Sequence, residues 1–342
     1  MRNHEVTTRQ PLLNDRGELR EPGWARQLIF DYDRRTIQAP AFRIKEWDYY
    51  LVMGDGFAGA FTISDDGYIG LQSVSLLVFG DRPWEHTETV LNAFPMGKLK
   101  LPASSAAGDT VYEDTRLQMR FVHEGAERHI TCRFENFYEK KPFTCDIRLA
   151  PPPPPGDTMV IATPWDKKHA FYYNQKINCM RASGWMEYAG VRYEFRPEHD
   201  FGTLDWGRGV WTYDNTWHWG SCNCDLGGKA FGFNIGYGFG NTAAATENVL
   251  FYDGRVHKLD DVTFHIDPED YMKPWRFTSS DERFEMDFLP VLDRAAKLDF
   301  KVLVSDQHQV FGKISGKAVL DDGTELMLDN VMCFAEKVHN RY

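Results

Sequence analysis

Turn dipeptides stand repeatedly between short strand-like runs, and this pattern constrains the fold more than any other feature of the sequence. Asp66-Gly67, Ala189-Gly190, Asp253-Gly254 and Asp322-Gly323 each separate two runs rich in β-branched and aromatic residues. Such dipeptides supply the positive φ angles that two-residue hairpin turns require. Aromatic residues make up 14% of the chain, and their rings pack well across the pleated faces of sheets. The sequence therefore predicts a mostly β, antiparallel protein.

Helical periodicity is weak along the whole chain. Only two short segments, around residues 83–94 and 289–296, suit a helix, so we expect few short helices. Between residues 231 and 239 the sequence FGFNIGYGF alternates glycine with bulky residues. Glycines in a strand permit sharp curvature or the close approach of another backbone, as occurs where a sheet bends into a barrel.

A run of five prolines, Pro151–Pro155, interrupts the strand-like sequence near the middle of the chain. Such a run is extended and stiff, which suits a connector. With 342 residues the chain is long enough for two ordinary domains, so we expect one domain over residues 1–150 and a second over 151–342. The alternative is that the run is a long loop within one domain.

Bulk composition excludes several classes of protein. Hydrophobic residues at 42% and charged residues at 26% are typical of a soluble globular chain. The net charge of −11 argues against nucleic-acid binding and against docking on anionic membranes. No apolar run is long enough for an integral membrane segment, and the first residues lack the apolar core of a secretion signal. We therefore expect a cytoplasmic location, which the low number of cysteines also favours.

No motif indicates a cofactor or a metal. Cys222 and Cys224 are spaced C-x-C, but no second pair completes a zinc set, so two small buried side chains are the better interpretation. The histidines show no metal-binding spacing. The glycines near residue 235 precede no predicted helix, so a dinucleotide site is not expected. The sequence predicts a site without cofactor and without metal.

One segment, Phe201–Gly220, holds four of the ten tryptophans: Trp206, Trp211, Trp217 and Trp219. Large rings form a dry wall, and ionisable groups set in such a wall have unusual acidity. The segment is typical of a site for a small apolar or ring-shaped ligand. The alternative is that the rings only pack in the core or at an edge.

Two carboxyls in and near this segment are candidates for catalysis. Asp205 lies between Leu204 and Trp206, and loss of hydration there would raise its pKa enough for proton donation near neutral pH. Arg208 follows three residues later, and the glycines on either side of it allow a tight backbone turn, so the two residues also suit a purely structural ion pair. Glu247 is the best second carboxyl, and its alternative is a solvated glutamate at a strand end.

Further polar and aromatic residues would contact the ligand. Asn174, Lys176 and Asn178 share one face of a predicted strand, which would line a cavity or face solvent. Trp47 and Tyr49 form a similar row, which would be the floor of a pocket or the rim of a barrel. The complete set of candidate ligand-binding residues is Trp206, Trp211, Trp219, Asn234, Asn248, Asn174, Lys176 and Tyr49.

Several long stretches resemble a known family. They are QPLLNDRGELREPGWARQ (Gln10–Gln27), RIKEWDYY (Arg43–Tyr50), FYYNQKINCM (Phe171–Met180), FGTLDWGRGVW (Phe201–Trp211) and ATENVLFYDGRVHKL (Ala245–Leu259). In these stretches the chain resembles the family domain of unknown function 2804. That family is in turn similar to the carotenoid 1,2-hydratase group, which includes hydroxyneurosporene synthase, AttH-like proteins and some Diels–Alder cyclases. The resemblance implies two lipocalin-like β-barrel or half-barrel domains that enclose an apolar ligand.

Three functions follow as hypotheses. The first is a cofactor-independent enzyme that hydrates, isomerises or cyclises an isoprenoid- or lipid-like molecule by acid catalysis. In it Asp205 is the proton donor, Glu247 assists, and Arg208 or Asn234 orients the substrate. The second is a non-catalytic carrier of a lipid or isoprenoid. The third is a glycoside-processing enzyme with paired carboxylates, because tryptophans also stack on sugar faces. The sequence leaves the oligomeric state open.

Overall fold

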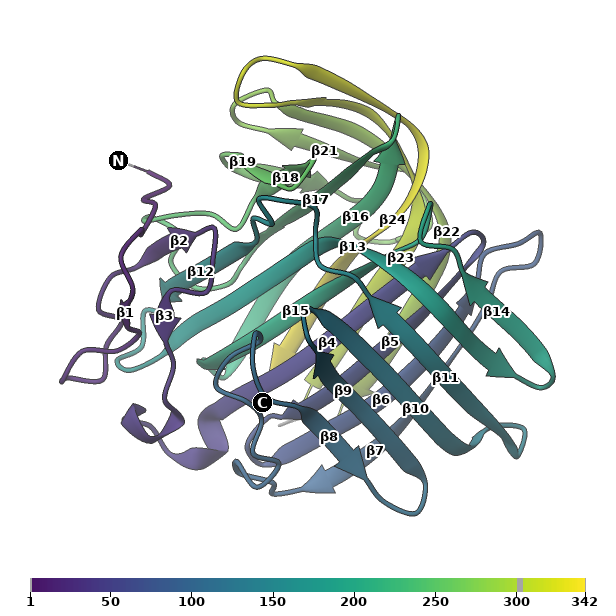
Figure 1. Cartoon of the computed structure of the whole chain (residues 1–342). Coiled ribbons are helices and arrows are strands. Elements are labelled where there is room, and N and C mark those ends of the chain that lie inside the picture. The colour runs from purple at the N-terminus through teal and green to yellow at the C-terminus, as the bar shows by residue number, and fades with distance from the viewer. Residues whose placement is uncertain (1, 300–303, 342) are drawn as a thin grey trace.

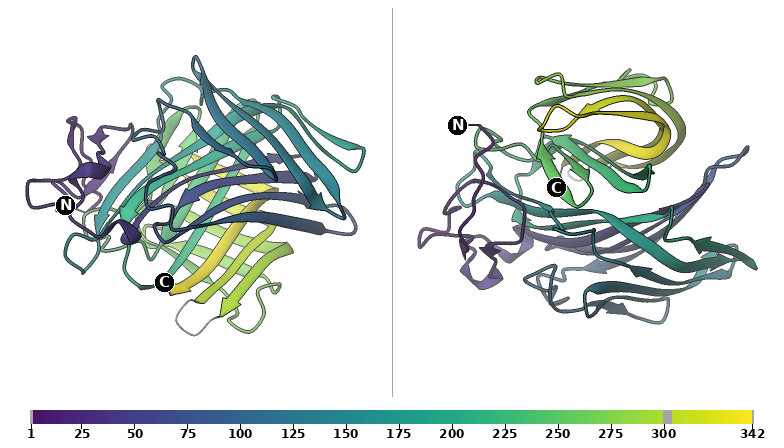
Figure 2. Two further views of the ribbon diagram at one scale, coloured as in Figure 1. Left: turned by 90° about the horizontal axis from the view of Figure 1, so that it is seen from below. Right: turned by 45° about the horizontal axis from the view of Figure 1, so that its top comes forward.

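Two curled antiparallel sheets make up nearly the whole molecule (Figure 1). The computed structural model describes residues 2–299 and 304–341. Each sheet bends into a half-barrel, and the sheets lie against each other, as Figure 2 shows from two further directions. The mostly β, double half-barrel architecture predicted from the sequence is confirmed.

The larger sheet has thirteen strands and is built from the first two thirds of the chain. Its main path runs in the order β7-β6-β5-β4-β15-β13-β11-β10-β9-β8, while β12 and β14 pair with β13, and β2 pairs with β12. The strands are β2 (Gly23–Ala25), β4 (Ile44–Gly54), β5 (Phe57–Asp65), β6 (Ile69–Val78), β7 (Trp84–Ala93), β8 (Thr110–Glu113), β9 (Leu117–Glu124), β10 (Glu127–Tyr138), β11 (Lys141–Leu149), β12 (Met159–Pro164), β13 (Phe171–Tyr188), β14 (Val191–Phe195) and β15 (Phe201–Val210).

The smaller sheet has nine strands in the order β19-β18-β17-β16-β24-β23-β22-β21-β20. The strands are β16 (Asp214–Leu226), β17 (Lys229–Tyr237), β18 (Val249–Tyr252), β19 (Arg255–Lys258), β20 (Val262–His265), β21 (Trp275–Ser279), β22 (Phe284–Asp299), β23 (Val304–Val319) and β24 (Glu325–Arg341). Near the N-terminus, β1 (Gln10–Pro11) and β3 (Phe30–Asp31) form a two-stranded parallel pair, and two 3-10 turns follow, η1 (Arg34–Thr36) and η2 (Ala41–Arg43).

The chain changes sheets once, between β15 and β16, at residues 211–213. The proline run Pro151–Pro155 connects β11 to β12, and both strands belong to the thirteen-stranded sheet. The predicted division near residue 150 therefore falls inside one sheet. The N-terminal strand β2 reaches across the chain to pair with β12, which ties the first residues to the segment after the prolines.

All four predicted hairpins form, and the turn at Asp253-Gly254 shows why. Its two residues have φ angles of 51° and 79°, which is the pair of positive values that a two-residue turn needs. The turn joins β18 to β19 in register. The prediction of short helices around residues 83–94 and 289–296 was wrong, because these segments form strands β7 and β22. Ladder hydrogen bonds with β6 and β23 outweigh the weak local helical pattern there.

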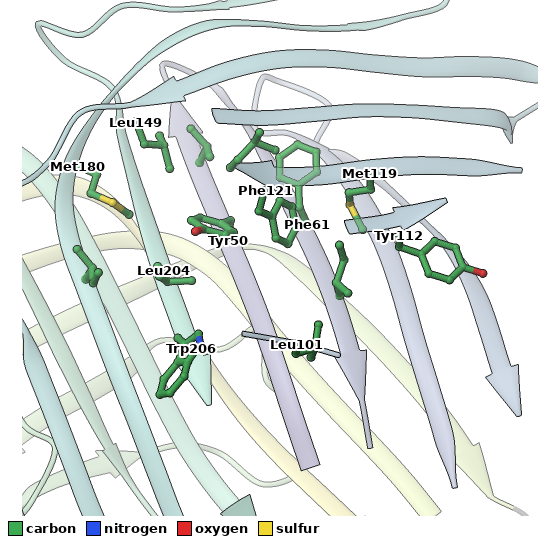
Figure 3. Close-up of a cluster of buried hydrophobic side chains, with 14 of the residues drawn as sticks. Tyr50, Phe61, Leu101, Tyr112, Met119, Phe121, Leu149, Met180, Leu204 and Trp206 are labelled. Carbon is green, nitrogen blue, oxygen red and sulfur yellow. The ribbon is translucent and has the colours of Figure 1, made fainter. Parts of the chain in front are cut away.

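The buried apolar side chains form three layers, one inside each sheet and one between the two sheets. The first fills the concave interior of the thirteen-stranded sheet, where Figure 3 shows Tyr50, Phe61, Leu204 and Trp206 among other buried side chains. A second fills the interior of the nine-stranded sheet. The third lies between the outer faces of the two sheets and is called here the inter-sheet layer; it includes Tyr49, Tyr172, Trp211, Trp219, Phe239, Phe311 and Phe334. Among the described residues, no helix has the length and apolar character to span a membrane.

A bulge in β13 fastens the two sheets to each other. The register with β15 shifts between Ile177 and Met180, and Cys179 inside the bulge has a φ of 61°. Beside it, the Asn178 amide donates to Ser221 Oγ at 2.8 Å, and the Cys179 N–H donates to Asn223 Oδ1 at 2.7 Å. Both acceptors belong to β16, so the bulge frees backbone and side-chain groups for the second sheet.

Candidate functional site

Polar side chains gather in the middle of the inter-sheet layer. Strand register places Lys176 of β13 opposite Asp205 of β15, and Asp205 opposite Tyr49 of β4. Because side chains on neighbouring strands at the same register share a face, these three groups form one row across the sheet. The row faces β16, β17 and β24 of the second sheet, whose Trp219 and Phe334 pack in the same layer.

Asp205 is held by an ion pair and an amide. The Lys176 Nζ lies 2.8 Å from Asp205 Oδ1, and Asn174 Nδ2 donates to the same oxygen at 2.6 Å. Exposure is divided unequally, since the Asp205 side chain is 11% exposed and that of Lys176 is 1% exposed. The carboxylate is therefore the part of this pair that solvent or a small molecule can reach.

The Lys176 ammonium has a second partner in an aromatic ring. Its Nζ lies 3.9 Å from the ring centroid of Trp219, a distance at which the ring face attracts a cation. The Tyr49 ring packs edge-on against Trp219 with centroids 5.9 Å apart. Asn174, Lys176 and Asn178, which sequence analysis placed on one face, are all buried and turned toward the second sheet.

Glu247 is the second carboxyl of the layer. Tyr172 donates its hydroxyl to Glu247 Oε2 at 3.2 Å, and Asn234 Nδ2 lies 3.3 Å from Oε1. Asn234 in turn accepts from Trp219 Nε1 at 2.7 Å. A side chain at Gly236 would put a Cβ 2.5 Å from the carboxylate, so this glycine makes room for it.

The surroundings of Glu247 raise its pKa. Burial raises the pKa above the ordinary value, Lys176 acts in the opposite direction, and the negative charge of Asp205 raises the pKa further. The pKa of the Tyr172 hydroxyl is raised as well, first by burial and then by Glu247, so this group stays a neutral donor. The layer thus combines a carboxyl of raised pKa with an ion pair.

Arg208 and Trp206 do not join this group. They lie on the opposite face of β15, in the interior of the thirteen-stranded sheet, and the guanidinium carbon of Arg208 lies 4.3 Å from the Trp206 ring centroid. Arg208 forms an ion pair with Asp48 at 3.0 Å and donates to Pro102 O at 2.8 Å. The Asp205–Arg208 pair considered in the sequence analysis does not form, because residues three apart on a strand point in opposite directions.

Asn248 also lies apart from the carboxyl groups. Its Oδ1 accepts from the Gly236 N–H at 2.7 Å, and its Nδ2 donates to Asp260 O at 2.8 Å. These contacts satisfy the backbone N–H of Gly236 in β17 and the backbone C=O of Asp260, which lies just before β20. The side chain therefore supports the loop that carries Glu247 and has no described contact with the other site residues.

Aromatic rings close one end of the layer, and this group is called the aromatic rim. Trp211 lies at its centre, with ring centroids 5.7 Å from Trp47, 5.5 Å from Trp165 and 5.3 Å from Trp217. Trp211 is buried, whereas the other three rings are half-buried and reach the surface. The rim therefore extends from the buried layer to the surface.

Three buried polar atoms at or near the rim have no hydrogen-bond partner among the described residues. They are Asn174 Oδ1, an acceptor, and the donors Trp165 Nε1 and Trp211 Nε1. Tyr172 stands next to Asn174 and Trp211, since it shares a strand face with Asn174 and its ring centroid is 5.9 Å from that of Trp211. Buried polar atoms are normally paired, so an orphan donor and an orphan acceptor here match a ligand with a hydroxyl or carbonyl group.

Sequence analysis missed two residues of this layer, Tyr172 and Glu336. Glu336 accepts from Trp217 Nε1 at 3.0 Å and from Gln309 Nε2 at 2.9 Å, and burial raises its pKa. The sequence carried a signal for Glu336, because this residue stands between Phe334 and Val338 on one strand face and interrupts their apolar pattern. Tyr172 could have been found from its place beside Asn174 on one strand face.

No metal-binding group is seen in the part of the chain that the structure describes. No three His, Cys, Asp or Glu residues in it are placed to hold an ion. The six cysteines are all free thiols, and Cys222 is buried beside Cys333 on the neighbouring strand.

The comparisons with other proteins place the chain in a family and a fold. The family described as "Domain of unknown function (DUF2804)" matches residues 3–342. The chain belongs to this family. No curated protein matches it.

Among solved structures, kievitone hydratase from Nectria haematococca is similar over 87% of this chain and 88% of its own, with 9% identity and a TM-score of 0.52. A candidate AttH from Nitrosomonas europaea is similar over 91% and 96%, with 14% identity and a TM-score of 0.49. At 9% identity the likeness to kievitone hydratase shows a shared fold and leaves the function to the site.

Proposed function

We propose that the inter-sheet layer binds a small apolar molecule and catalyses addition of water, isomerisation or cyclisation by acid catalysis, without a cofactor. The observation that carries this proposal is Glu247, a buried carboxyl with a raised pKa that is hydrogen-bonded to Tyr172 and set among aromatic rings. A carboxyl that stays protonated near neutral pH is able to protonate a carbon–carbon double bond. The fold shared with kievitone hydratase is consistent with this chemistry.

The proposal reverses the roles that the sequence suggested for the two carboxyls. Asp205 is paired with Lys176 and Asn174, so it serves as the negative charge of the site and later as the base, while Glu247 is the proton donor. In a hydration, the Glu247 proton forms a new C–H bond and leaves a carbocation. The carboxylate of Asp205 stabilises that cation.

Completion of the hydration needs a base for the attacking water. The water oxygen forms the C–O bond, and Asp205, the more exposed partner of its ion pair, takes the released proton. Asp205 then releases this proton to solvent and Glu247 takes one up from solvent, so both carboxyls are restored and the net reaction adds one water. Isomerisation or cyclisation follows the same first step and ends when a C–H proton is lost instead.

A carrier of apolar molecules is the alternative, favoured by the ion pair that already satisfies Asp205. The two functions differ in what Glu247 does: it donates a proton in the enzyme and only contacts the ligand in the carrier.

Purified protein is incubated with a neutral-lipid extract in ¹⁸O-labelled water, and the masses of bound and released molecules are measured. We expect a product that has gained labelled water, or an isomer with changed retention.

The decisive variant is Glu247→Gln, which keeps the shape and removes the acid. Loss of general acid catalysis lowers turnover by about 10²–10⁴-fold. Glu325→Gln, at an exposed position of β24, is the matched control and keeps full turnover. If wild type and Glu247→Gln retain the ligand equally and neither changes it chemically, the chain is a carrier and the proposal of an enzyme is wrong.

A further inference from the structure

Two neighbouring loops carry a local charge opposite to that of the whole chain. Residues 33–43 and 94–100 together contain five cationic residues and a single acidic one, in a chain of net charge −11. The cations are Arg34, Arg35, Arg43, Lys98 and Lys100, and the acidic residue is Asp33. These two loops are called here the basic–apolar surface, and they include η1 and η2 at the lower left of Figure 1.

The two loops form one continuous surface. The Met96 N–H donates to Gly67 O at 2.9 Å, and the backbone of Phe42 lies so close to Gly67 that a Cβ there would overlap it. A Cβ on Gly97 would lie 2.6 Å from Arg34 Nε. The loop after β7 is therefore packed directly against the loop before β4.

Large apolar side chains protrude from this surface. Phe42 is 49% exposed, Phe94 58% and Met96 39%, and outside the two loops Tyr213, just before β16, is 52% exposed. These are four of the ten large apolar side chains that the described residues expose. Single exposed apolar residues are ordinary, but a group of them at one end of a molecule marks an interaction surface.

Cationic groups stand beside the apolar side chains. Lys98 and Lys100 form no ion pair with any described residue, whereas Arg34 is paired with Glu46 and Arg35 with Asp33. Arg34, Arg35 and Lys100 line an open cleft of about 400 Å³ together with Asp33 and Glu46, the carboxylates that pair with the two arginines. The free positive charge of the surface therefore comes from the lysines, and Lys100 places it at a cleft with space for a charged group of moderate size.

We propose that the basic–apolar surface docks on an anionic phospholipid bilayer. Phe42, Phe94 and Met96 enter the interface, the lysines contact the phosphates, and the cleft receives a phosphodiester headgroup. Exposed apolar side chains combined with lysine and arginine are the composition of interfacial membrane contacts. A nucleic acid would use the charges but would leave the apolar side chains unused.

Local charge decides this contact in spite of the negative net charge. At physiological salt, electrostatic interactions decay over about 8–10 Å, so the bilayer senses mainly the charges at the contact. The expectation from total charge, that the chain avoids anionic membranes, applies to an average orientation of the molecule. A surface with one acidic residue and five basic ones is the exception to that average.

The docking surface adjoins the aromatic rim. Arg43 Nη2 donates to Trp211 O at 2.6 Å, so the loop before β4 touches the central ring residue of the rim. If the proposed function holds, an apolar substrate passes from the bilayer to the inter-sheet layer over this short path. The docking itself is independent of turnover and is measured without substrate.

Vesicle flotation with the full chain tests the proposal. We expect the chain to float with vesicles of phosphatidylcholine and phosphatidylglycerol and much less with phosphatidylcholine alone. Each lysine near an anionic surface contributes about 1 kcal/mol, so Lys98→Glu combined with Lys100→Glu lowers partitioning by roughly 25-fold or more. Phe94→Ser combined with Met96→Ser lowers it on both kinds of vesicle.

The matched control is Leu289→Ser combined with Met327→Ser, which removes side chains that are 54% and 66% exposed on the second sheet. It should float like wild type. Thermal melting confirms that each variant is folded, and the single variants Lys98→Glu and Phe94→Ser replace any double variant that melts early. The proposal is overturned if wild type does not float, if control and surface variants float alike, or if only a nucleic acid duplex binds.

Discussion

Lys176 connects the two carboxyls of the inter-sheet layer. Its ammonium lies 2.8 Å from Asp205 and over the face of Trp219, and its positive charge lowers the pKa of Glu247 against the effect of burial. With 1% of its side chain exposed, the ammonium depends on these partners in place of water. One residue thus pairs with Asp205 while it limits how far burial raises the pKa of Glu247.

Replacement of Lys176 by methionine should affect stability and pH dependence together. Lys176→Met leaves Asp205 buried without its cation, which costs about 3 kcal/mol of unfolding free energy. It also removes the group that lowers the pKa of Glu247, so the rate of the acid-catalysed step falls at a higher pH than in wild type. Urea unfolding and a pH–rate profile measure the two effects.

The double variant Lys176→Met with Asp205→Asn is the control for this experiment. It removes both charges and should regain much of the lost stability. An unchanged profile in the single variant would show that Lys176 does not act on Glu247.

Successive side chains of a strand point to opposite faces of the sheet, and this alternation separates the candidate site residues into two groups. Asp205 was expected beside Arg208, because the glycines that flank Arg208 suggested a tight turn. In the structure the segment is a central strand, so Arg208 points into the opposite layer. Glu247 and Asn234 do meet, although nothing in the sequence gives the contact between them. Composition located the segment, while the orientation of each side chain depended on the secondary structure.

At the scale of elements, β15 shows how glycine shapes the layer. Gly207 lies opposite Trp47 of β4, and a Cβ on Gly207 would overlap the Trp47 ring. The ring therefore lies flat over the backbone of the neighbouring strand and contributes to the aromatic rim. A central strand tolerates glycine at a cost in stability, which the packing of this ring offsets.

Substitution of Gly207 should reveal this packing. Gly207→Ala puts a methyl group into a rigid ring and lowers the unfolding free energy by about 1–3 kcal/mol. The same change at Gly80, where a Cβ would meet no atom within 4 Å, should have little effect.

A double-mutant cycle completes the test. In a Trp47→Ala background, Gly207→Ala should cost much less than in wild type, because the ring that it strikes is absent. Additive losses in the cycle would mean that the ring is not what the methyl group meets.

The sequence was enough to predict individual hairpins, but it did not predict how the strands assemble into sheets. The turn at Asp253-Gly254 sets its hairpin by its own φ preferences, so the sequence was sufficient there. The pairing of β4 with β15 joins residues far apart in the chain, and no local signal encodes it. The segments taken for helices became strands for the same reason, since ladders with β6 and β23 decide them.

At the scale of the whole molecule, the inter-sheet layer holds acidic groups that prefer to be neutral. Burial raises the pKa of Glu247 and of Glu336 above the ordinary value of 4.5. The folded chain therefore keeps their protons over a pH interval above 4.5 in which the unfolded chain has released them. Across that interval these groups lower stability as pH rises.

Glu336→Gln isolates this effect because glutamine cannot ionise. The difference in unfolding free energy between Glu336→Gln and wild type should grow in favour of the variant as pH rises from about 4.5. Urea unfolding at several pH values measures the slope, which does not depend on any hydrogen bond lost at all pH values.

Asp306→Asn provides a control of opposite sign. The pKa of Asp306 is lowered, chiefly by its hydrogen bond to Lys297, so its stabilisation is present at neutral pH and lost in acid. The difference between this variant and wild type should therefore grow against the variant as pH rises. Parallel slopes in the two variants would contradict the assignment of a neutral buried glutamate.

The bulge of β13 determines how the molecule could open. Asn178 and Cys179 bond to β16 at that point, while at the other end the sheets are joined by the crossing chain and by the rings around Trp211. The two sheets are therefore attached at both ends of the layer, by hydrogen bonds at the bulge and by the covalent chain at Trp211. A breathing motion that admits a guest molecule would have to part the sheets between these two attachments.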